Sequence, residues 1–408
     1  MASSSNSKTS HDHSDKDSYS LMWITTLGLL TLLGPMSIDM YLPALPAIAT
    51  QFTVSTSAIS TSLPAYFLGL AIGQLIYGPI SDHFGRKPPL YFGLTLFTVA
   101  SVLCALTTQL EQLLLLRVVQ ALGGCVGMAM VRAAIRDRLS PLQSAKALSN
   151  MMLIMGIAPI IAPLIGGWLL VTLGWQSIFI FLACCGLASI LLVHFKFDET
   201  LDIQQRPPLS LGHAFSNYAK ILQDRSFLIP TLAGSLSYAA FFSYISAAPA
   251  ILIDQFKIQP QFFGWYFGAN AIGLIVFSQL NVRLVGHYRL ARILSLGILI
   301  QFISGIWLLL WQYVEQINQT IIMLGLFGIV ASIGLVSANS NALAMLQQGK
   351  LAGSASALQG ALQFLISFTI VPMSHTLGLP PLLNLSLTVV ACTLIGFLLA
   401  LWLNNKAD

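Results

Sequence analysis

Charged side chains are scarce in this chain of 408 residues. Asp, Glu, Lys and Arg make up 8% of the sequence, whereas hydrophobic residues make up 56%. Soluble domains usually carry about 25% charged residues. The scarcity of charge therefore excludes an ordinary soluble fold and indicates a polytopic membrane protein. The formal net charge of +5 is expected in one set of loops, and we do not take it as a sign of nucleic-acid binding.

Sequence patterns of enzymes, metal sites and nucleotide sites are also missing. The five cysteines lie in apolar stretches without a Cys-x-x-Cys pair, which fits buried free thiols. No His-Glu-x-x-His, Gly-x-Ser-x-Gly or phosphate-loop motif occurs. We therefore expect no enzymatic activity, no metal site and no cofactor. His11 and His13 could bind a metal, but a solvated tail explains them better. Without a nucleotide site, transport would have to draw on an ion gradient.

Long apolar stretches are abundant, and about 20 apolar residues suffice for a membrane-spanning helix. The sequence predicts an all-α protein with twelve such helices. They cover about 21–48, 58–80, 89–108, 112–134, 145–171, 175–195, 227–253, 262–282, 291–312, 320–345, 353–374 and 382–403. The long connection 197–225 separates two six-helix bundles, 21–196 and 226–404. Residues 1–20 form a polar disordered tail and residues 405–408 a short second tail.

The positions of Lys and Arg predict the orientation. With a cytoplasmic N-terminus, seventeen of the nineteen Lys and Arg residues fall on the inner side, as the positive-inside rule requires. Basic turns follow span two (Arg86, Lys87) and span eight (Arg283, Arg289), which suggests a degenerate repeat of the two halves. We therefore expect a multi-pass protein of the inner (cytoplasmic) membrane with both termini in the cytoplasm.

A single acid, Asp39, interrupts the first apolar span. An acid within such a span costs roughly 2.5–3.5 kcal/mol on insertion scales, so it is expected to face a cavity or a partner. Pro43 and Pro46 are expected to break the helix beyond Asp39. Asp39 would then lie about 10 Å inside the outer end of the helix. The alternative is an acid that lies in the outer headgroup zone. We interpret Asp39 as a functional residue.

Three further stretches carry unusual residues. The joint after span two reads Gly-Pro-Ile-Ser-Asp-His-Phe-Gly-Arg-Lys over 78–87, where two glycines favour a tight turn. Arg117 and Gln120 share one face of span four. Span five combines glycines and prolines, which favour close helix packing. Alternatively, 78–87 is a generic tight loop, Arg117 has a purely structural role, and the glycines and prolines of span five serve helix packing alone.

These stretches resemble the major facilitator superfamily. Ser37–Ala44 of span one and Arg117–Gly127 of span four are similar to its Bcr/CflA-type (bicyclomycin and chloramphenicol resistance) drug:proton antiporters. The resemblance implies the major facilitator fold, with two pseudo-symmetric six-helix bundles. It also implies proton coupling by Asp39, Arg117 and Gln120. A conformational gate is expected from Gly78, Asp82, Gly85, Arg86, Lys87 and Asp137, and an antiporter motif from Gly156, Pro159, Pro163, Gly166 and Gly167.

An amphipathic substrate pocket is the remaining site that we predict. Its candidates are aromatic and amide side chains of both halves: Tyr41, Tyr66, Tyr238, Phe242, Tyr266, Asn270, Asn339 and Gln363. Any single one of them could instead face lipid or the core. The expected partners are a small amphipathic molecule, protons and the lipid bilayer, with the chain acting as a monomer.

The resemblance implies a proton-coupled exporter of amphipathic drugs that works by alternating access. A proton-linked transporter of one specific metabolite or siderophore is the alternative. A non-transporting sensor would not need an acid that titrates inside the membrane, and a membrane-embedded enzyme would need paired catalytic groups.

Depth along the helices links Asp39 to Arg117. Each lies seven residues from an outer helix end, which is about 10 Å. Burial favours a neutral carboxyl and a nearby guanidinium favours the charged form. We therefore expect the two to face one cavity and to interact directly, through Gln120 or through water. We also expect Arg86 to pair with Asp137, and Asp82 to face the start of span eleven near Gly353.

Overall fold

The computed structural model describes residues 21–139, 141–206, 208, 210–312, 314, 318–375 and 378–406. Within these ranges the chain forms helices and no strand. Twelve helices or helix pairs are long and apolar enough to cross a membrane, which confirms the predicted number of spans. His11, His13 and most of the two tails lie outside the described residues.

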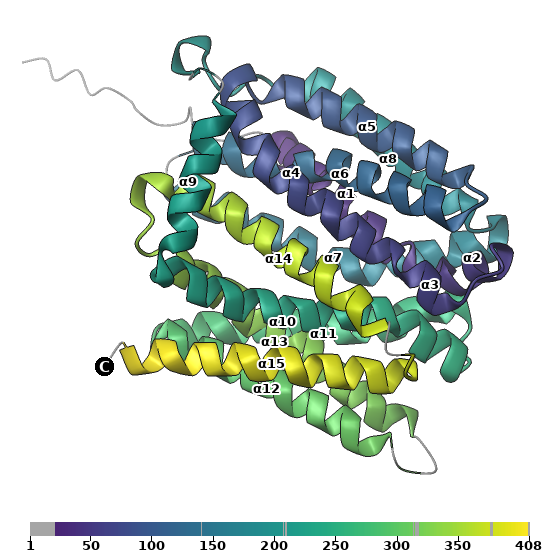
Figure 1. Cartoon of the computed structure of the whole chain (residues 1–408). Helices are drawn as coiled ribbons and strands as arrows, with labels where there is room; N and C mark the ends of the chain where they lie inside the picture. The colour runs from purple at the N-terminus through teal and green to yellow at the C-terminus, as the bar shows by residue number, and fades with distance from the viewer. Residues whose placement is uncertain are drawn as a thin grey trace, which may run out of the picture.

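The first half contains six spans (Figure 1). The first consists of α1 (Leu21–Asp39), η1 (Leu42–Ala44) and α2 (Leu45–Gln51), and the second of α3 (Thr56–Ser60) and α4 (Ser62–Phe84). The others are α5 (Lys87–Ala105), α6 (Leu110–Arg138), α7 (Pro141–Leu173) and α8 (Gln176–Lys196).

The second half repeats this plan. Its first span is α10 (Arg225–Pro249) with the π-helical turn η3 (Ala250–Gln255). The others are α11 (Pro260–Val285), α12 (Leu290–Trp311), α13 (Gln319–Met345), α14 (Ala352–His375) and α15 (Pro381–Lys406). We call the end of the molecule at which α4, α6 and α8 finish the basic end, because Arg86, Arg138 and Lys196 lie there.

Two helix pairs join the halves: α4 packs on α14, and α7 packs on α11 (Figure 1). Glycines make the second contact close. A side chain on Gly264 or Gly268 of α11 would meet Leu164 or Ile160 of α7. Small residues let helix backbones approach where no hydrophobic force drives helices together in lipid. The two halves are therefore in extensive contact.

The connection between the halves is more ordered than predicted. It contains η2 (Ile203–Gln205) and α9 (Leu211–Gln223), which lies across the basic end (Figure 1). Ser210 caps α9 by accepting a hydrogen bond from the His213 amide. Tyr218 and Ile221 bury one face of α9. This cap and the apolar spacing were the signal for a helix where we expected a loop.

Candidate functional site

The first span is broken at Asp39. Helix α1 ends there and a short 3-10 turn follows before the span resumes as α2. Pro43 explains the break, because it has no N–H to donate to the carbonyl of Asp39, its partner four residues earlier in a continuous helix. Broken helices within a membrane are tolerated where their backbone lies against protein or a cavity, and they often form binding sites.

Asp39 is buried, with 5% of its surface exposed, and α2 extends the span by twelve residues beyond it. This burial disfavours the headgroup alternative. No Lys, Arg or His among the described residues lies within ion-pair distance of Asp39; the three ion pairs there involve Arg86 and Arg206. The turn η1 packs against α7 of its own half and against α10 and α11 of the other. Asp39 therefore lies where the first half touches the second.

Tyr244 of α10 is a candidate partner for Asp39 from the second half. It is buried and lies within electrostatic range of Asp39. Its hydroxyl oxygen accepts a hydrogen bond of 2.9 Å from the Asn270 amide. The hydroxyl hydrogen therefore stays available as a donor. Asn270 was predicted from the sequence, whereas Tyr244 was missed among several aromatic residues of α10.

Arg117 is fully buried, and no carboxylate pairs with it among the described residues. It donates to Gln120 Oε1 at 2.7 Å and to the Ser37 carbonyl at 3.0 Å. Its guanidinium lies 4.8 Å from the ring centre of Tyr41 and 4.3 Å from that of Tyr66. Of the interactions expected between Asp39 and Arg117, the direct ion pair is therefore absent among the described residues. Counting residues from the helix ends predicted the depth of the two groups in the membrane, but not the direction in which each side chain points.

The contacts of Arg117 instead stabilise the end of α1. The Ser37 carbonyl belongs to the last turn of α1, where the carbonyls of a broken helix lack partners and favour a cation. Gln120 completes the site, because its amide donates to Ser101 Oγ at 2.8 Å. The Arg117 Nε has no hydrogen-bond partner. Arg117 and Gln120 thus contact each other, as expected from their shared helix face, and Arg117 also bonds the helix that carries Asp39.

The glycines of span five contact the same break. A Cβ on Gly166 would lie 2.0 Å from the Met40 carbonyl oxygen, and one on Gly167 would lie 2.6 Å from the Pro260 carbonyl oxygen. Gly156, by contrast, would meet only the flexible end of Ile275 at 3.4 Å. Pro159 and Pro163 lie inside the continuous helix α7. Gly166 and Gly167 therefore let α7 touch both the break and the start of α11.

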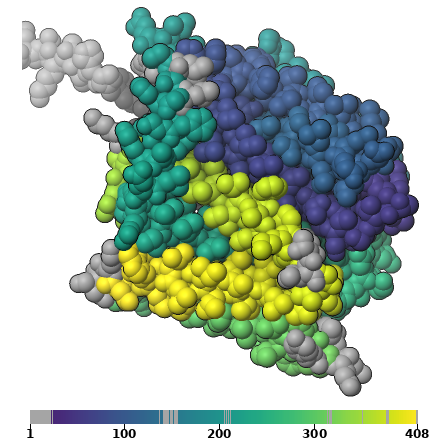
Figure 2. Space-filling view, viewed as in Figure 1, coloured from purple at the N-terminus to yellow at the C-terminus, as the bar shows by residue number. Residues whose placement is uncertain are grey.

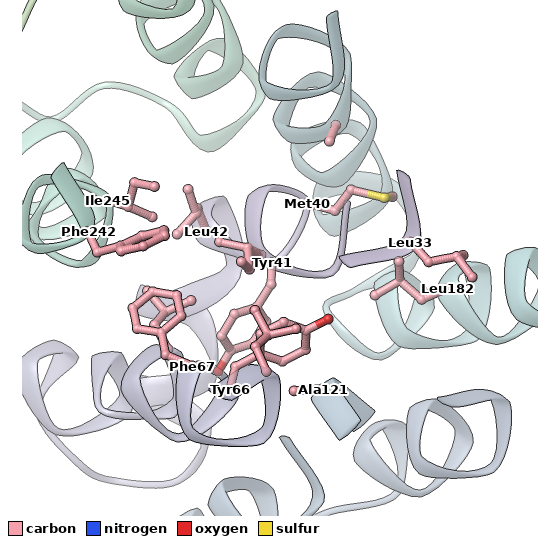
Figure 3. Close-up of a cluster of buried hydrophobic side chains, with 14 of the residues drawn as sticks. Leu33, Met40, Tyr41, Leu42, Tyr66, Phe67, Ala121, Leu182, Phe242 and Ile245 are labelled. Atoms are coloured by element: carbon pink, nitrogen blue, oxygen red, sulfur yellow. The ribbon is translucent and has the colours of Figure 1, made fainter. Parts of the chain in front are cut away.

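Aromatic residues from both halves meet, with Phe67 of the first half beside Phe242 of the second (Figure 3). Phe67 of α4 lies with its ring centre 4.3 Å from that of Phe242 and 6.2 Å from that of Phe364. Tyr238 extends this cluster, at 5.9 Å from Phe242, and Gln363 is within hydrogen-bonding reach of its hydroxyl. The structure thus brings together Tyr238, Phe242 and Gln363, as predicted, and adds Phe67 and Phe364.

The other predicted pocket residues lie in different surroundings. Tyr41 hydrogen-bonds Ser62 at 3.0 Å, and Tyr66 donates to the Gly34 carbonyl at 3.4 Å, so both lie on the Arg117 side. Tyr266 is half-buried against the core. Asn339 donates to Asn281 Oδ1 and to the Leu335 carbonyl, both at 2.6 Å. Its NH2 group is thus used within the second half, and its role in the pocket stays a prediction.

Arg86 is the centre of a charged cluster at the basic end. It donates to Asp137 at 2.8 Å, as predicted, and to Asp82 at 2.6 Å. The pKa of Arg86 is raised: burial lowers it, and the two carboxylates more than compensate. Among the described residues, Asp82 has no hydrogen bond or ion pair to the start of span eleven, and its carboxylate accepts a hydrogen bond from Arg86 instead.

The two glycines of this stretch differ. Gly85 has a φ of +91°, which favours glycine, and it forms the turn between α4 and α5. Gly78 lies inside α4, and a Cβ there would meet nothing within 4 Å. The prediction that Gly78 belongs to the tight turn is therefore wrong, because α4 continues to Phe84.

Glu199 of the connecting segment completes this cluster, and no sequence pattern pointed to it. Its carboxylate accepts hydrogen bonds from the backbone amides of Arg86 at 2.9 Å and Lys87 at 3.1 Å, at the start of α5. It also accepts from Thr200 and Leu201. Burial raises the pKa of Glu199, but these four donors outweigh it and hold the pKa below its usual value. Lys87 thus contributes its backbone amide to this charged cluster.

Both ends of the interface between the halves carry features that bear on opening. At the basic end, the Tyr218 hydroxyl of α9 donates to the Leu75 carbonyl of α4 at 3.0 Å. At the other end, a cavity of about 290 Å³ lies between α3 and the second half. Its lining is uncharged: Ser55, Ser57, Ser60, Ser246, Ala247, Ala250, Gly378, Leu379, Pro381 and Asn384. Thus α9 connects the halves at the basic end, and a cavity lies between them at the other end.

The family model described as Major Facilitator Superfamily matches residues 27–372. A bicyclomycin resistance protein homolog of Haemophilus influenzae is 29% identical, over 94% of this chain and 96% of its own. The multidrug resistance protein MdtL of Klebsiella pneumoniae is 30% identical, over 91% and 93%.

Among solved structures, a D-xylose-proton symporter superposes with a TM-score of 0.74 at 15% identity, over 93% of this chain and 97% of that one. At this identity the likeness concerns the fold alone. It confirms the predicted arrangement of twelve helices in two bundles.

Proposed function

The chain belongs to the Major Facilitator Superfamily, and we propose that it is a proton-coupled exporter of amphipathic drugs or other toxic small molecules. The names of its relatives support this class of substrate. The observation that carries the proposal is the buried acid Asp39 at a helix break that touches the other half. A proton on that acid can change the contact between the halves, which is what coupling requires.

Coupling is proposed to act through Asp39 and Tyr244. Asp39 lies 18 residues from the start of α1 and Tyr244 lies 19 residues from the start of α10, so both lie about 27–29 Å from the basic end. A charged Asp39 can accept the free hydroxyl hydrogen of Tyr244, which holds the two halves together. Protonation removes that charge and weakens the contact. Proton binding and drug binding would then favour different conformations of the same two halves.

Arg117 and Gln120 are proposed to keep the break in place. Their bonds to each other and to the Ser37 carbonyl fix the backbone two residues before Asp39. Gly166 supports the break from the other side through Met40. Asp39 is then the group that changes state, whereas Arg117 remains charged and fixed.

The charged cluster at the basic end is proposed as the gate, with that end in the cytoplasm together with both termini. The Arg86 pairs, the Glu199 hydrogen bonds and the Tyr218 contact support a closed cytoplasmic side. The cavity at the other end supports an exit toward the outside. A phosphatase active only outside the cytoplasm, fused after Lys406, should be inactive, and strong activity would contradict this orientation.

A susceptibility panel in a host that lacks its own drug pumps tests the proposal. The wild-type chain should raise the inhibitory concentration of chloramphenicol or bicyclomycin. Asp39→Asn should abolish this effect at an equal membrane level of protein, because the amide cannot titrate. Asp254→Asn, in η3 near the end of the first span of the second half, is the matched control and should keep resistance. Full resistance with Asp39→Asn would contradict the proposal.

The chain is further proposed to act as a monomer, because each half already packs its helices against the other half. Cross-linking in membranes at low expression should give one band at the size of a single chain. A dominant dimer band would contradict this.

A further inference from the structure

A groove runs along the outer surface of the second half, between the first turn of α10 and the last turns of α15. These two helices lie side by side (Figures 1 and 2). The groove has a volume of about 470 Å³. Six of its lining residues are apolar and one is charged: Leu228, Ile229, Ile395, Leu398, Leu399, Trp402 and Arg225. All of its lining residues belong to the second half, and none of them lines the cavity between the halves.

The groove has a polar end and an apolar end. Arg225 begins α10, and Trp402 lies four residues before the end of α15, so both lie near the membrane interface at the basic end. Ile395 lies seven residues further into the membrane, which is about 10 Å. Ile395 and Leu398 are 52% and 58% exposed. This polarity matches a phospholipid, whose phosphate lies at the interface and whose acyl chains lie below it.

Arg225 is available for an anion. Its side chain is exposed and takes part in none of the three ion pairs among the described residues. The adjacent acid, Asp224, directs its carboxylate elsewhere. It accepts hydrogen bonds from Ser226 and from Gln348, at 2.7 Å and 2.8 Å from their side chains. The guanidinium has a planar set of donors that suits a phosphate group.

We propose that this groove binds an anionic glycerophospholipid. Arg225 would hold the phosphate, and the apolar wall formed by α10 and α15 would hold one acyl chain. Anionic lipids are favoured over zwitterionic ones because the net charge of the headgroup then complements Arg225. A cationic drug would be repelled at the same place.

Trp402 offers a reporter within the groove. The purified chain is reconstituted in vesicles of phosphatidylglycerol and phosphatidylcholine, in which one lipid at a time carries brominated acyl chains that quench tryptophan at short range. The part of the signal that comes from Trp402 is the difference between the wild-type chain and Trp402→Phe. Brominated phosphatidylglycerol is expected to quench this signal about fivefold more effectively than its share of the vesicle predicts.

Arg225→Gln should bring that preference close to one, whereas Arg225→Lys should keep part of it. Arg283→Gln is the matched control, because Arg283 is exposed in the last turn of α11 and lies outside the groove. Equal quenching by both lipids in the wild-type chain, or an unchanged preference in Arg225→Gln, would overturn the proposal.

Mass spectrometry of the intact chain, released from detergent, gives a second measurement without a tryptophan variant. Phosphatidylglycerol should be retained by the wild-type chain and by Arg283→Gln, and lost from Arg225→Gln. Equal retention by all three would count against a lipid site at Arg225.

Discussion

The carboxylate of Glu199 offers a sharp test of how the connecting segment holds the gate. In Glu199→Gln one side-chain oxygen is replaced by an NH₂ group, which is a donor and faces the Arg86 or Lys87 amide. Those two amides lie 2.9 Å and 3.1 Å from the carboxylate. Hydrogen bonds to charged groups contribute roughly 1.5–3 kcal/mol, and an anion at a helix N-terminus adds about 0.3–1 kcal/mol. We expect a loss of roughly 2 kcal/mol at neutral pH.

Thermal unfolding of the purified chain in detergent measures this loss. The pKa of Glu199 is lower in the folded chain than its unfolded value of 4.5, so its stabilisation is complete above that value. As pH falls below about 4.5 through the folded pKa, the stabilisation is lost. The Tm difference between the wild-type chain and Glu199→Gln should therefore be present at pH 7 and shrink in acid.

Asp198→Asn is the matched control, because Asp198 is the neighbouring acid and is exposed. It should leave the Tm unchanged. Equal Tm values for the wild-type chain and Glu199→Gln at pH 7, or a difference that grows as pH falls, would refute the reasoning.

Three further substitutions, one of them with a matched control, test the helix break, the role of Arg117 and the contact at the basic end. Gly166→Ala should abolish drug resistance or lower the amount of folded protein, because its Cβ would lie 2.0 Å from the Met40 carbonyl oxygen, whereas Gly78→Ala should be tolerated in resistance assays. Arg117→Lys should lower the drug transport rate at least tenfold, because an ammonium cannot bond Gln120 and the Ser37 carbonyl with a planar fork; a wild-type rate in proteoliposomes would count against this role. Tyr218→Phe removes one hydrogen bond worth about 1 kcal/mol, so spin-label distances between α4 and α14 should show several-fold more molecules open at the basic end, and an unchanged distribution would exclude Tyr218 as a latch.

Much of the fold could be predicted from hydropathy and charge. The twelve spans follow from runs of apolar residues, and the break at Asp39 follows from Pro43. The Arg86–Asp137 pair could be predicted because both residues lie at the same end of adjacent helices. In each case the sequence position alone determines depth in the membrane.

Features that depend on helix rotation or on long-range contacts could not be predicted. Asp39 and Arg117 lie at similar depth, but Arg117 bonds the Ser37 carbonyl instead of the Asp39 carboxylate. Glu199 lies in a polar segment without periodicity, so nothing in its neighbourhood pointed to the start of α5. The polar side chain of Asn339 suggested a pocket residue, but its amide donates a hydrogen bond to Asn281 on the adjacent helix.

The central claim is that Asp39 carries the proton that is exchanged for the drug. The direct measurement is proton release by the purified chain in weakly buffered detergent when chloramphenicol is added, followed with a pH-sensitive dye. Drug binding is recorded in parallel by tryptophan fluorescence. The wild-type chain and Asp254→Asn should release protons on binding, whereas Asp39→Asn should bind the drug and release none. Proton release by Asp39→Asn at the wild-type level would contradict it.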